Sequence, residues 1–129
     1  MRWRLEWGEQ PEALEVGSEP ALLQLLDELD ERASDQPMLV DLISPAGDSL
    51  SIGLGRDKSV LTWVQANQEP PYFVSLSSDP VDGSIVFDYR GEWSEFPARF
   101  ALDTPIAKAA LVDFFRTGSL PTSIAWTDE

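Results

Sequence analysis

Short apolar runs separated by turn-forming residues constrain the fold more than any other feature of the sequence. The runs lie at 38–43, 50–54, 60–64, 72–76 and 85–89, and the turns between them are rich in Pro, Gly, Asp and Asn. Such runs have the length and composition of β-strands. Consecutive strands joined by short connections pair antiparallel. The central part of the chain therefore predicts an antiparallel meander.

The N-terminal part predicts a strand followed by a helix. Aromatic, leucine and charged residues alternate at 3–7, which is the period of a strand with one buried face. Residues 8–17 are predicted to form an acidic connection. Ser18 is a good N-cap, and leucines recur at helical spacing across Glu19–Ala33. The outer side of this helix carries the acidic residues Asp27, Glu28, Asp30 and Glu31.

The C-terminal part predicts a second helix between two short strands. Thr104 as N-cap, followed by Pro105, is a strong helix start, and the apolar spacing carries the helix to Thr117. Gly118 lies where a left-handed residue ends a helix, and Pro121 blocks its continuation. The short strands are predicted at 99–102 and 123–126.

Together these elements predict one α+β domain over residues 1–129. The predicted order is β-α-β-β-β-β-β-α-β, with two helices packed on a mostly antiparallel sheet. A chain of 129 residues has the size of one domain and can bury a substantial core without a metal or a disulfide.

The sequence contains neither histidine nor cysteine, and this absence excludes several classes of catalyst. A Ser-His-Asp or Cys-His nucleophile cannot be assembled. Zinc sites of the His or Cys type, haem or iron–sulfur ligation by these residues, and disulfides are excluded as well. We therefore expect a protein that is not an enzyme and that holds no cofactor and no metal.

The net charge of −14 restricts the possible partners. Binding to nucleic acid or to an anionic membrane depends on Lys and Arg, so neither is expected. The charge permits a basic protein partner, although solubility alone is the plainer interpretation. From Glu6 to Asp35, ten acidic residues stand against the single base Arg32. No apolar run is long enough for a membrane span and no signal peptide is evident, so we expect a cytoplasmic protein, with a monomer favoured.

Two patterns are better explained by structure than by chemistry. Gly53–Ser59 resembles a phosphate-binding loop, but the glycine before the lysine is missing. A tight backbone approach at the end of a strand is the better interpretation. Asp79, Asp82 and Asp88 lack the spacing of a calcium loop and fit a solvated turn.

Residues 92–95 place Trp93 between two carboxylates in a predicted polar loop. An exposed Trp beside acids suits an interface hot spot, and a Trp folded back on the sheet is the alternative. Glu92 and Glu95 also allow a carboxylate pair for acid–base catalysis, although no substrate cleft is indicated. Together with Asp88, these residues form the predicted partner-binding loop.

Several motifs of the C-terminal half follow one another in a known order. They are Tyr89-Arg90-Gly91, Ser94-Glu95-Phe96-Pro97, the Thr104-Pro105 helix start, Thr117-Gly118-Ser119-Leu120-Pro121 and Trp126. Upstream, the segments 50–55 and 59–64 and the pair Pro71-Tyr72 fit the same pattern. From Met38 to Trp126 the chain resembles the immunity protein 1 family of bacterial polymorphic-toxin immunity proteins.

The resemblance implies an α+β immunity protein that binds its own toxin and has no catalytic activity. Members of that family are typically encoded beside a toxin, often one with a nucleic-acid deaminase domain. We expect the motif residues to have structural roles, with Trp126 largely buried against the second helix near Phe114 or Phe115. The motif residues in question are Gly91, Pro97, Gly118, Pro121 and Trp126.

Three functions remain open at this point. The first is an immunity protein that covers the active site of a basic toxin, with the acids of the first helix providing long-range steering. The second is an acidic binding module, or a nucleic-acid mimic, that regulates another basic protein. The third is a small enzyme that uses carboxylates. The expected contacts in the first case are Asp88, Glu92, Trp93 and Glu95.

Overall fold

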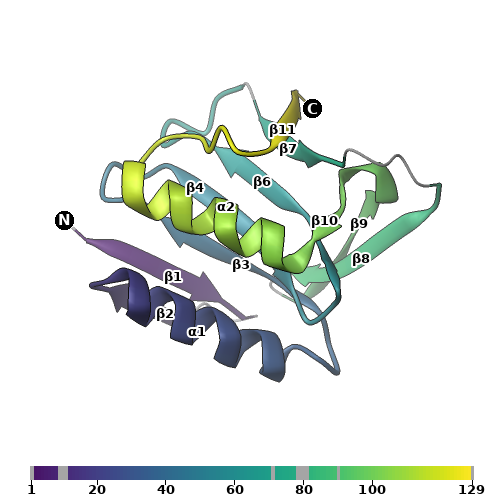
Figure 1. Cartoon of the computed structure of the whole chain (residues 1–129), viewed down its shortest axis with the longest axis horizontal. Helices are drawn as coiled ribbons and strands as arrows, with labels where there is room; N and C mark the ends of the chain where they lie inside the picture. The colour runs from purple at the N-terminus through teal and green to yellow at the C-terminus, as the bar shows by residue number, and fades with distance from the viewer. Residues whose placement is uncertain (1, 9–11, 71, 78–81, 90, 129) are drawn as a thin grey trace.

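A computed structural model describes residues 2–8, 12–70, 72–77, 82–89 and 91–128. Two helices lie on one face of a large sheet, and a β-hairpin lies at the end of the sheet near the start of the second helix (Figure 1). The helices are α1 (Glu19–Arg32) and α2 (Thr104–Thr117). The strands are β1 (Trp3–Trp7), β2 (Glu12–Val16), β3 (Met38–Ile43), β4 (Ser49–Leu54), β5 (Lys58–Ser59), β6 (Leu61–Val64), β7 (Phe73–Leu76), β8 (Ser84–Tyr89), β9 (Glu92–Pro97), β10 (Leu102–Asp103) and β11 (Ala125–Asp128).

The main sheet confirms the predicted α+β class. Its strand order is β11-β7-β6-β4-β3-β1-β2, and all neighbours along this path pair antiparallel. The strands β3, β4, β6 and β7 are neighbours in the sheet and form four strands of the predicted meander. The turn predicted at 79–83 and the motif residues Pro71 and Arg90 lie wholly or partly outside the described residues.

At the N-terminal side, the structure corrects one predicted element and confirms the start of another. The acidic connection predicted at 8–17 contains the strand β2, which pairs with β1 in the register Trp3↔Val16. Val16 is buried in this pairing, so the gain from covering apolar surface outweighs the acidic composition. The helix α1 starts as predicted, because the Ser18 hydroxyl accepts a hydrogen bond from Ala21 N–H at 3.3 Å.

The fifth predicted strand leaves the meander. The free edge of β7 pairs with β11, and β8 turns back on itself to pair with β9. The polar loop predicted around Trp93 is therefore wrong, since 92–97 is a strand. Gly91, with φ of 90°, adopts the left-handed conformation that the turn of this hairpin needs. The aromatic residues of β9 also favour a strand, because aromatic side chains are enriched in strands.

Smaller corrections concern the segment before α2. The strand predicted at 99–102 is a 3₁₀ turn at Ala98–Phe100 followed by the two-residue strand β10. Thr104 is the first helical residue and not the N-cap, which is Asp103. The Thr104 hydroxyl instead donates to the Arg56 carbonyl at 2.7 Å. A contact with a distant segment thus competes successfully with local capping.

The main core lies between the helices and the sheet. Leu22, Leu26 and Leu29 of α1 are fully buried, as the helical spacing predicts. Phe114 of α2 is also fully buried and lies between two tryptophan rings, with centroids 4.9 Å from Trp3 and 5.1 Å from Trp63. Other buried residues of the main core are Leu5, Val40, Leu42, Leu50, Ile52, Leu54 and Leu111.

A second core lies on the opposite face of the sheet, under the β8–β9 hairpin. Its buried members are Leu39, Val60, Val74, Phe87 and Phe100. Leu39 belongs to this face because it alternates along β3 with residues that face the helices. The ring of Phe87 lies against Gly53, where an added Cβ would come within 2.5 Å of the ring. The close approach predicted for this segment is therefore a contact with the hairpin at Gly53, whereas Gly55 approaches the backbone of Ala33 at the end of α1.

In the described part of the chain, no helix has both the length and the apolar character that crossing a membrane requires.

Candidate partner-binding site

The outer face of the β8–β9 hairpin brings together three of the four predicted contact residues. Asp88 pairs directly with Trp93, and Glu95 pairs with Val86. These four residues alternate with the fully buried Phe87 and its cross-strand partner, so they point away from the sheet. We call Val86, Asp88, Trp93 and Glu95 the outer hairpin face. It combines two carboxylates with one large aromatic side chain.

Trp93 dominates this face. Its exposed fraction is 61%, the highest among the large hydrophobic residues that the structure describes as exposed. The alternative in which Trp93 folds back on the sheet is therefore excluded. An exposed Trp is a large apolar surface with few rotatable bonds, which is the kind of side chain that anchors interfaces.

The fourth predicted contact, Glu92, lies on the other side of the hairpin. It pairs with Tyr89, and this pair alternates with Asp88 and Trp93. Glu92 and Glu95 are three positions apart on one strand, so they point to opposite faces. A joint acid–base role for these two carboxylates, as in the enzyme hypothesis, is not compatible with this geometry.

Contacts from two other segments, residues 36–37 and Arg56, hold the hairpin in place. The backbone N–H of Asp88 donates to the Pro37 carbonyl at 2.7 Å, and Gln36 Nε2 donates to Asp88 Oδ2 at 3.1 Å. Arg56 Nε donates to the Val86 carbonyl at 3.1 Å, and its guanidinium lies 5.8 Å from the centre of the Phe87 ring. A surface held in this way loses little conformational entropy when it binds.

A buried carboxylate fixes the inner side of the hairpin, and the sequence analysis missed it. Asp41 is only 6% exposed; its Oδ1 accepts from the Ser51 hydroxyl and its Oδ2 accepts from the Tyr89 hydroxyl at 3.0 Å. These residues line a cavity of about 530 Å³ between the sheet and the hairpin. An acid inside the apolar run 38–43 was the available signal, because a buried carboxylate requires hydrogen-bond donors.

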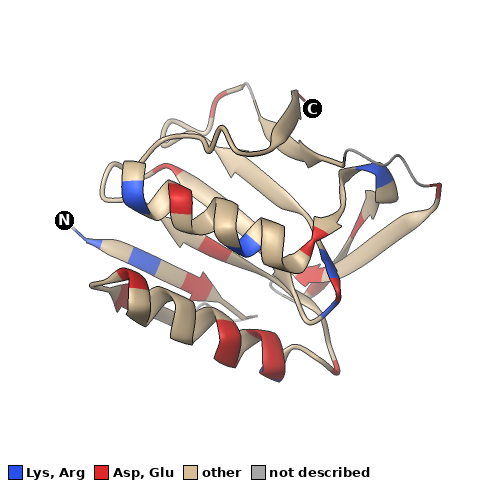
Figure 2. Cartoon of the chain, in the orientation of Figure 1, with Lys and Arg blue, Asp and Glu red and all other residues tan. Residues whose placement is uncertain are grey.

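The four acidic residues predicted for the outer side of α1 divide into two pairs, while Glu19 at the start of the helix pairs with Arg116 of α2. Glu28 and Glu31 are exposed on the outer side of the helix, as predicted. Asp27 and Asp30 instead bind Lys108 of α2, with Nζ to carboxylate distances of 3.2 and 3.0 Å. Acidic residues gather at the C-terminal end of α1 (Figure 2), and the ion pairs with Lys108 connect this end to α2. Of the four residues predicted to steer the partner, only Glu28 and Glu31 therefore form no ion pair with α2.

Lys108 and Asp30 join three elements. Burial of Lys108 opposes its charged form, but the hydrogen bonds from the ammonium to Asp30 and Asp27 outweigh this and raise the pKa of Lys108 above its ordinary value. The other oxygen of Asp30 accepts the backbone N–H of Gly55 at 2.7 Å. Asp30 thus connects α1 to α2 and to the end of β4, which is a structural role.

The remaining motif residues stabilise the C-terminal segment. Gly118, with φ of 71°, ends α2 as predicted, and its N–H donates to the Phe114 carbonyl. Pro121 is buried, and its carbonyl accepts from Trp126 Nε1 at 2.7 Å. Trp126 is half-buried against the main core, so it is more exposed than predicted. It lies in β11, which is displaced by two residues from the predicted strand.

In the residues that the structure describes, no group of three or more Asp, Glu, His or Cys side chains is arranged to hold a metal ion. The outer hairpin face combines an exposed aromatic side chain with two carboxylates.

A comparison with protein families identifies the family to which the chain belongs. The model of the family described as Immunity protein Imm1 matches residues 10–128, which is most of the chain. The chain belongs to this immunity protein family, and membership points to the neutralisation of a toxin. The match also includes β2 and α1, upstream of the segment that carried the resemblance. No curated protein matches the chain.

Proposed function

We propose that the chain neutralises one cognate bacterial toxin, a nucleic-acid deaminase, by placing the outer hairpin face over the toxin's active site. The observation that carries this proposal is the exposed Trp93 between the carboxylates of Asp88 and Glu95 on a rigidly held hairpin. A toxin that binds nucleic acid presents a basic groove, and these carboxylates match such a groove in charge.

The net charge of −14 supports the same partner. Exposed acids on α1 add a long-range field, which accelerates the association of oppositely charged proteins. We further propose that the protein acts in the cytoplasm as a monomer, without nucleic acid or membrane as a partner and without catalysis of its own. Glu92 contributes at the tip of the hairpin and not through its outer face.

The test uses the toxin encoded by the adjacent gene, in a catalytically inactive form for binding and in an active form for inhibition. The wild-type chain is expected to bind this toxin tightly and to stop deamination of a single-stranded oligonucleotide. Trp93→Ala should weaken binding by about 2 kcal/mol or more, mainly through faster dissociation. The matched control is Tyr72→Ala, which also truncates an exposed aromatic residue but lies outside the hairpin.

Two outcomes would contradict the proposal. If Trp93→Ala dissociates from the toxin as slowly as the wild type, the hairpin is not the anchor. If the chain does not bind the toxin but binds an unrelated basic protein, the second hypothesis, an acidic binding module, is correct.

A further inference from the structure

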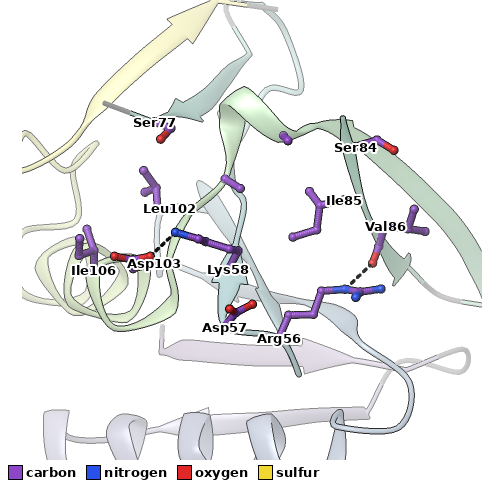
Figure 3. Close-up of a pocket in the computed structure, with 12 residues that line it drawn as sticks. Arg56, Asp57, Lys58, Ser77, Ser84, Ile85, Val86, Leu102, Asp103 and Ile106 are labelled. Carbon is purple, nitrogen blue, oxygen red and sulfur yellow. Dashed lines mark hydrogen bonds and ion pairs between the residues drawn. The ribbon is translucent and has the colours of Figure 1, made fainter. Parts of the chain in front are cut away.

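A hollow beside the outer hairpin face has a different chemical character. It lies between β8, the β5–β10 ribbon and the start of α2, and its volume is about 400 Å³ (Figure 3). Ile106, in the first turn of α2, is 49% exposed at this place. We call this hollow the β8 groove. Its apolar lining consists of Ile85, Val86, Ala98, Ala101, Leu102 and Ile106.

The backbone of β8 forms one wall of the groove. The Asp88 N–H donates to Pro37 and the Val86 carbonyl accepts from Arg56, so both groups point away from β9. Because backbone groups alternate along an antiparallel strand, the N–H groups of Val86 and Ser84 point to the same side. Among the described strands, only Met38 of β3 pairs with this edge, at Asp88. The N–H groups of Ser84 and Val86 on this edge are thus available for another strand, whereas the Val86 carbonyl accepts from Arg56.

The charges around the groove differ from those of the rest of the surface. Lys58 forms an ion pair with Asp103, and Arg56 and Asp57 stand beside them in the lining. Among the described residues, no carboxylate lies within ion-pair distance of Arg56. Among the described lining residues, two bases stand against two acids, in a chain whose net charge is −14. Such a place suits an apolar segment that brings a carboxylate to Arg56.

Val86 belongs both to this lining and to the outer hairpin face. The two surfaces are therefore continuous, and a partner that covers Trp93 can also contact the groove. We propose that an extended segment of the toxin adds a strand to the open edge of β8, places apolar side chains in the groove and pairs a carboxylate with Arg56. Addition of a strand to a sheet edge gives affinity through backbone hydrogen bonds and specificity through alternate side chains. This proposal rests on the proposed function and deepens it.

The first experiment follows amide hydrogen exchange by NMR, with the inactive toxin from the adjacent gene as the probe. In the free chain, the amides of Ser84 and Val86 should exchange faster than those of Ile85 and Phe87, which face β9. In the complex, the amides of Ser84 and Val86 should slow by about tenfold or more relative to the other two. A general stiffening of the hairpin would slow all four together and would overturn the added strand.

The second experiment measures dissociation of the toxin from groove variants. Ile106→Glu places a charge in the apolar groove and should speed dissociation by about tenfold or more. The matched control is Leu23→Glu, which makes the same change at a residue of α1 that is 40% exposed. Arg56→Gln should also speed dissociation, whereas Arg32→Gln changes the net charge equally on the exposed surface of α1 and should not.

The outcomes separate this proposal from the proposed function. Suppose that Trp93→Ala weakens binding, that Ile106→Glu and Arg56→Gln leave dissociation unchanged, and that exchange of the Val86 amide is not slowed in the complex. The immunity function then stands, and the proposal of strand addition at the β8 groove is overturned. If the wild-type chain does not bind the toxin at all, the proposed function fails and the groove proposal fails with it.

Discussion

The two faces of the central sheet are covered in different ways. On one face, α1 and α2 enclose a large core in which Phe114 contacts Trp3 and Trp63. On the other face, the β8–β9 hairpin covers a small core and leaves a cavity of about 530 Å³ around Asp41. Burial of apolar area is the main source of stability, so we expect the helical face to determine whether the chain folds. The hairpin face then carries the exposed aromatic and the acids.

The largest expected effect is on the helical face. Phe114→Ala removes a fully buried ring from between two tryptophans and should lower the free energy of unfolding by about 3–5 kcal/mol. Chemical denaturation of the variant and the wild type measures this. Phe115→Ala is the control, because its ring is half-buried and should cost less. Equal losses for the two variants would show that the main core is not organised around Phe114.

A smaller effect is expected where the hairpin meets the sheet. Gly53→Ala introduces a methyl group 2.5 Å from the Phe87 ring and should cost about 1–3 kcal/mol. The strain should appear as faster amide exchange in β8 and β9, while β1 and β3 stay protected. Gly17→Ala serves as the control, since nothing lies within 4 Å of its added Cβ. Faster exchange throughout the sheet would show that the two faces do not respond independently.

The link between α1 and α2 should be weaker and should depend on pH. Lys108→Met removes the ammonium that binds Asp27 and Asp30 and should cost under about 1 kcal/mol at neutral pH. The pKa of Lys108 is raised in the folded chain above 10.5, so its contribution is complete below that value. The contribution disappears as the pH rises through the higher folded pKa. Melting temperatures of the two proteins should therefore converge in strong base, and a difference that persists there would contradict the ion-pair account.

The smallest effect concerns the exposed acids of α1. Reversal of both charges, by Glu28→Lys with Glu31→Lys, should slow association with the toxin several-fold and leave dissociation unchanged. Stability should change by no more than about 0.5 kcal/mol, as for other surface substitutions. Stopped-flow measurements at two salt concentrations provide the test. Glu69→Lys, in the connection after β6, is the control for a charge change elsewhere on the surface.

The sequence was informative where local patterns decide the structure. Alternation at 3–7, the leucine spacing of α1 and the glycine at the end of α2 all predicted elements that the structure confirms. It was less informative where distant segments meet. The strand β2 forms because it pairs with β1. Thr104 does not cap α2, because its hydroxyl donates to the Arg56 carbonyl. Such contacts have no local pattern.

The candidate site shows the same division. The composition around Trp93 suggested an exposed aromatic among acids and left a Trp folded back on the sheet as the alternative, and the structure shows the exposed position. The register of the hairpin decided which of these residues share a face, and it separated Glu92 from Glu95. The roles of Asp30 and Asp41 depend on partners 25 or more and 10 or more positions away, respectively, so spacing along the helix or the strand could not reveal them.

The unequal burial of the five tryptophans gives the chain an optical reporter of its own. Trp7 and Trp63 are buried, Trp3 and Trp126 are half-buried, and Trp93 stands in solvent on the hairpin. Indole emission shifts to shorter wavelength when the ring leaves water, so a blue shift on complex formation would come chiefly from Trp93. Acrylamide, which is uncharged, would quench the same ring without repulsion by Asp88 and Glu95. Binding can thus be followed by intrinsic fluorescence, with no dye attached to the surface under study.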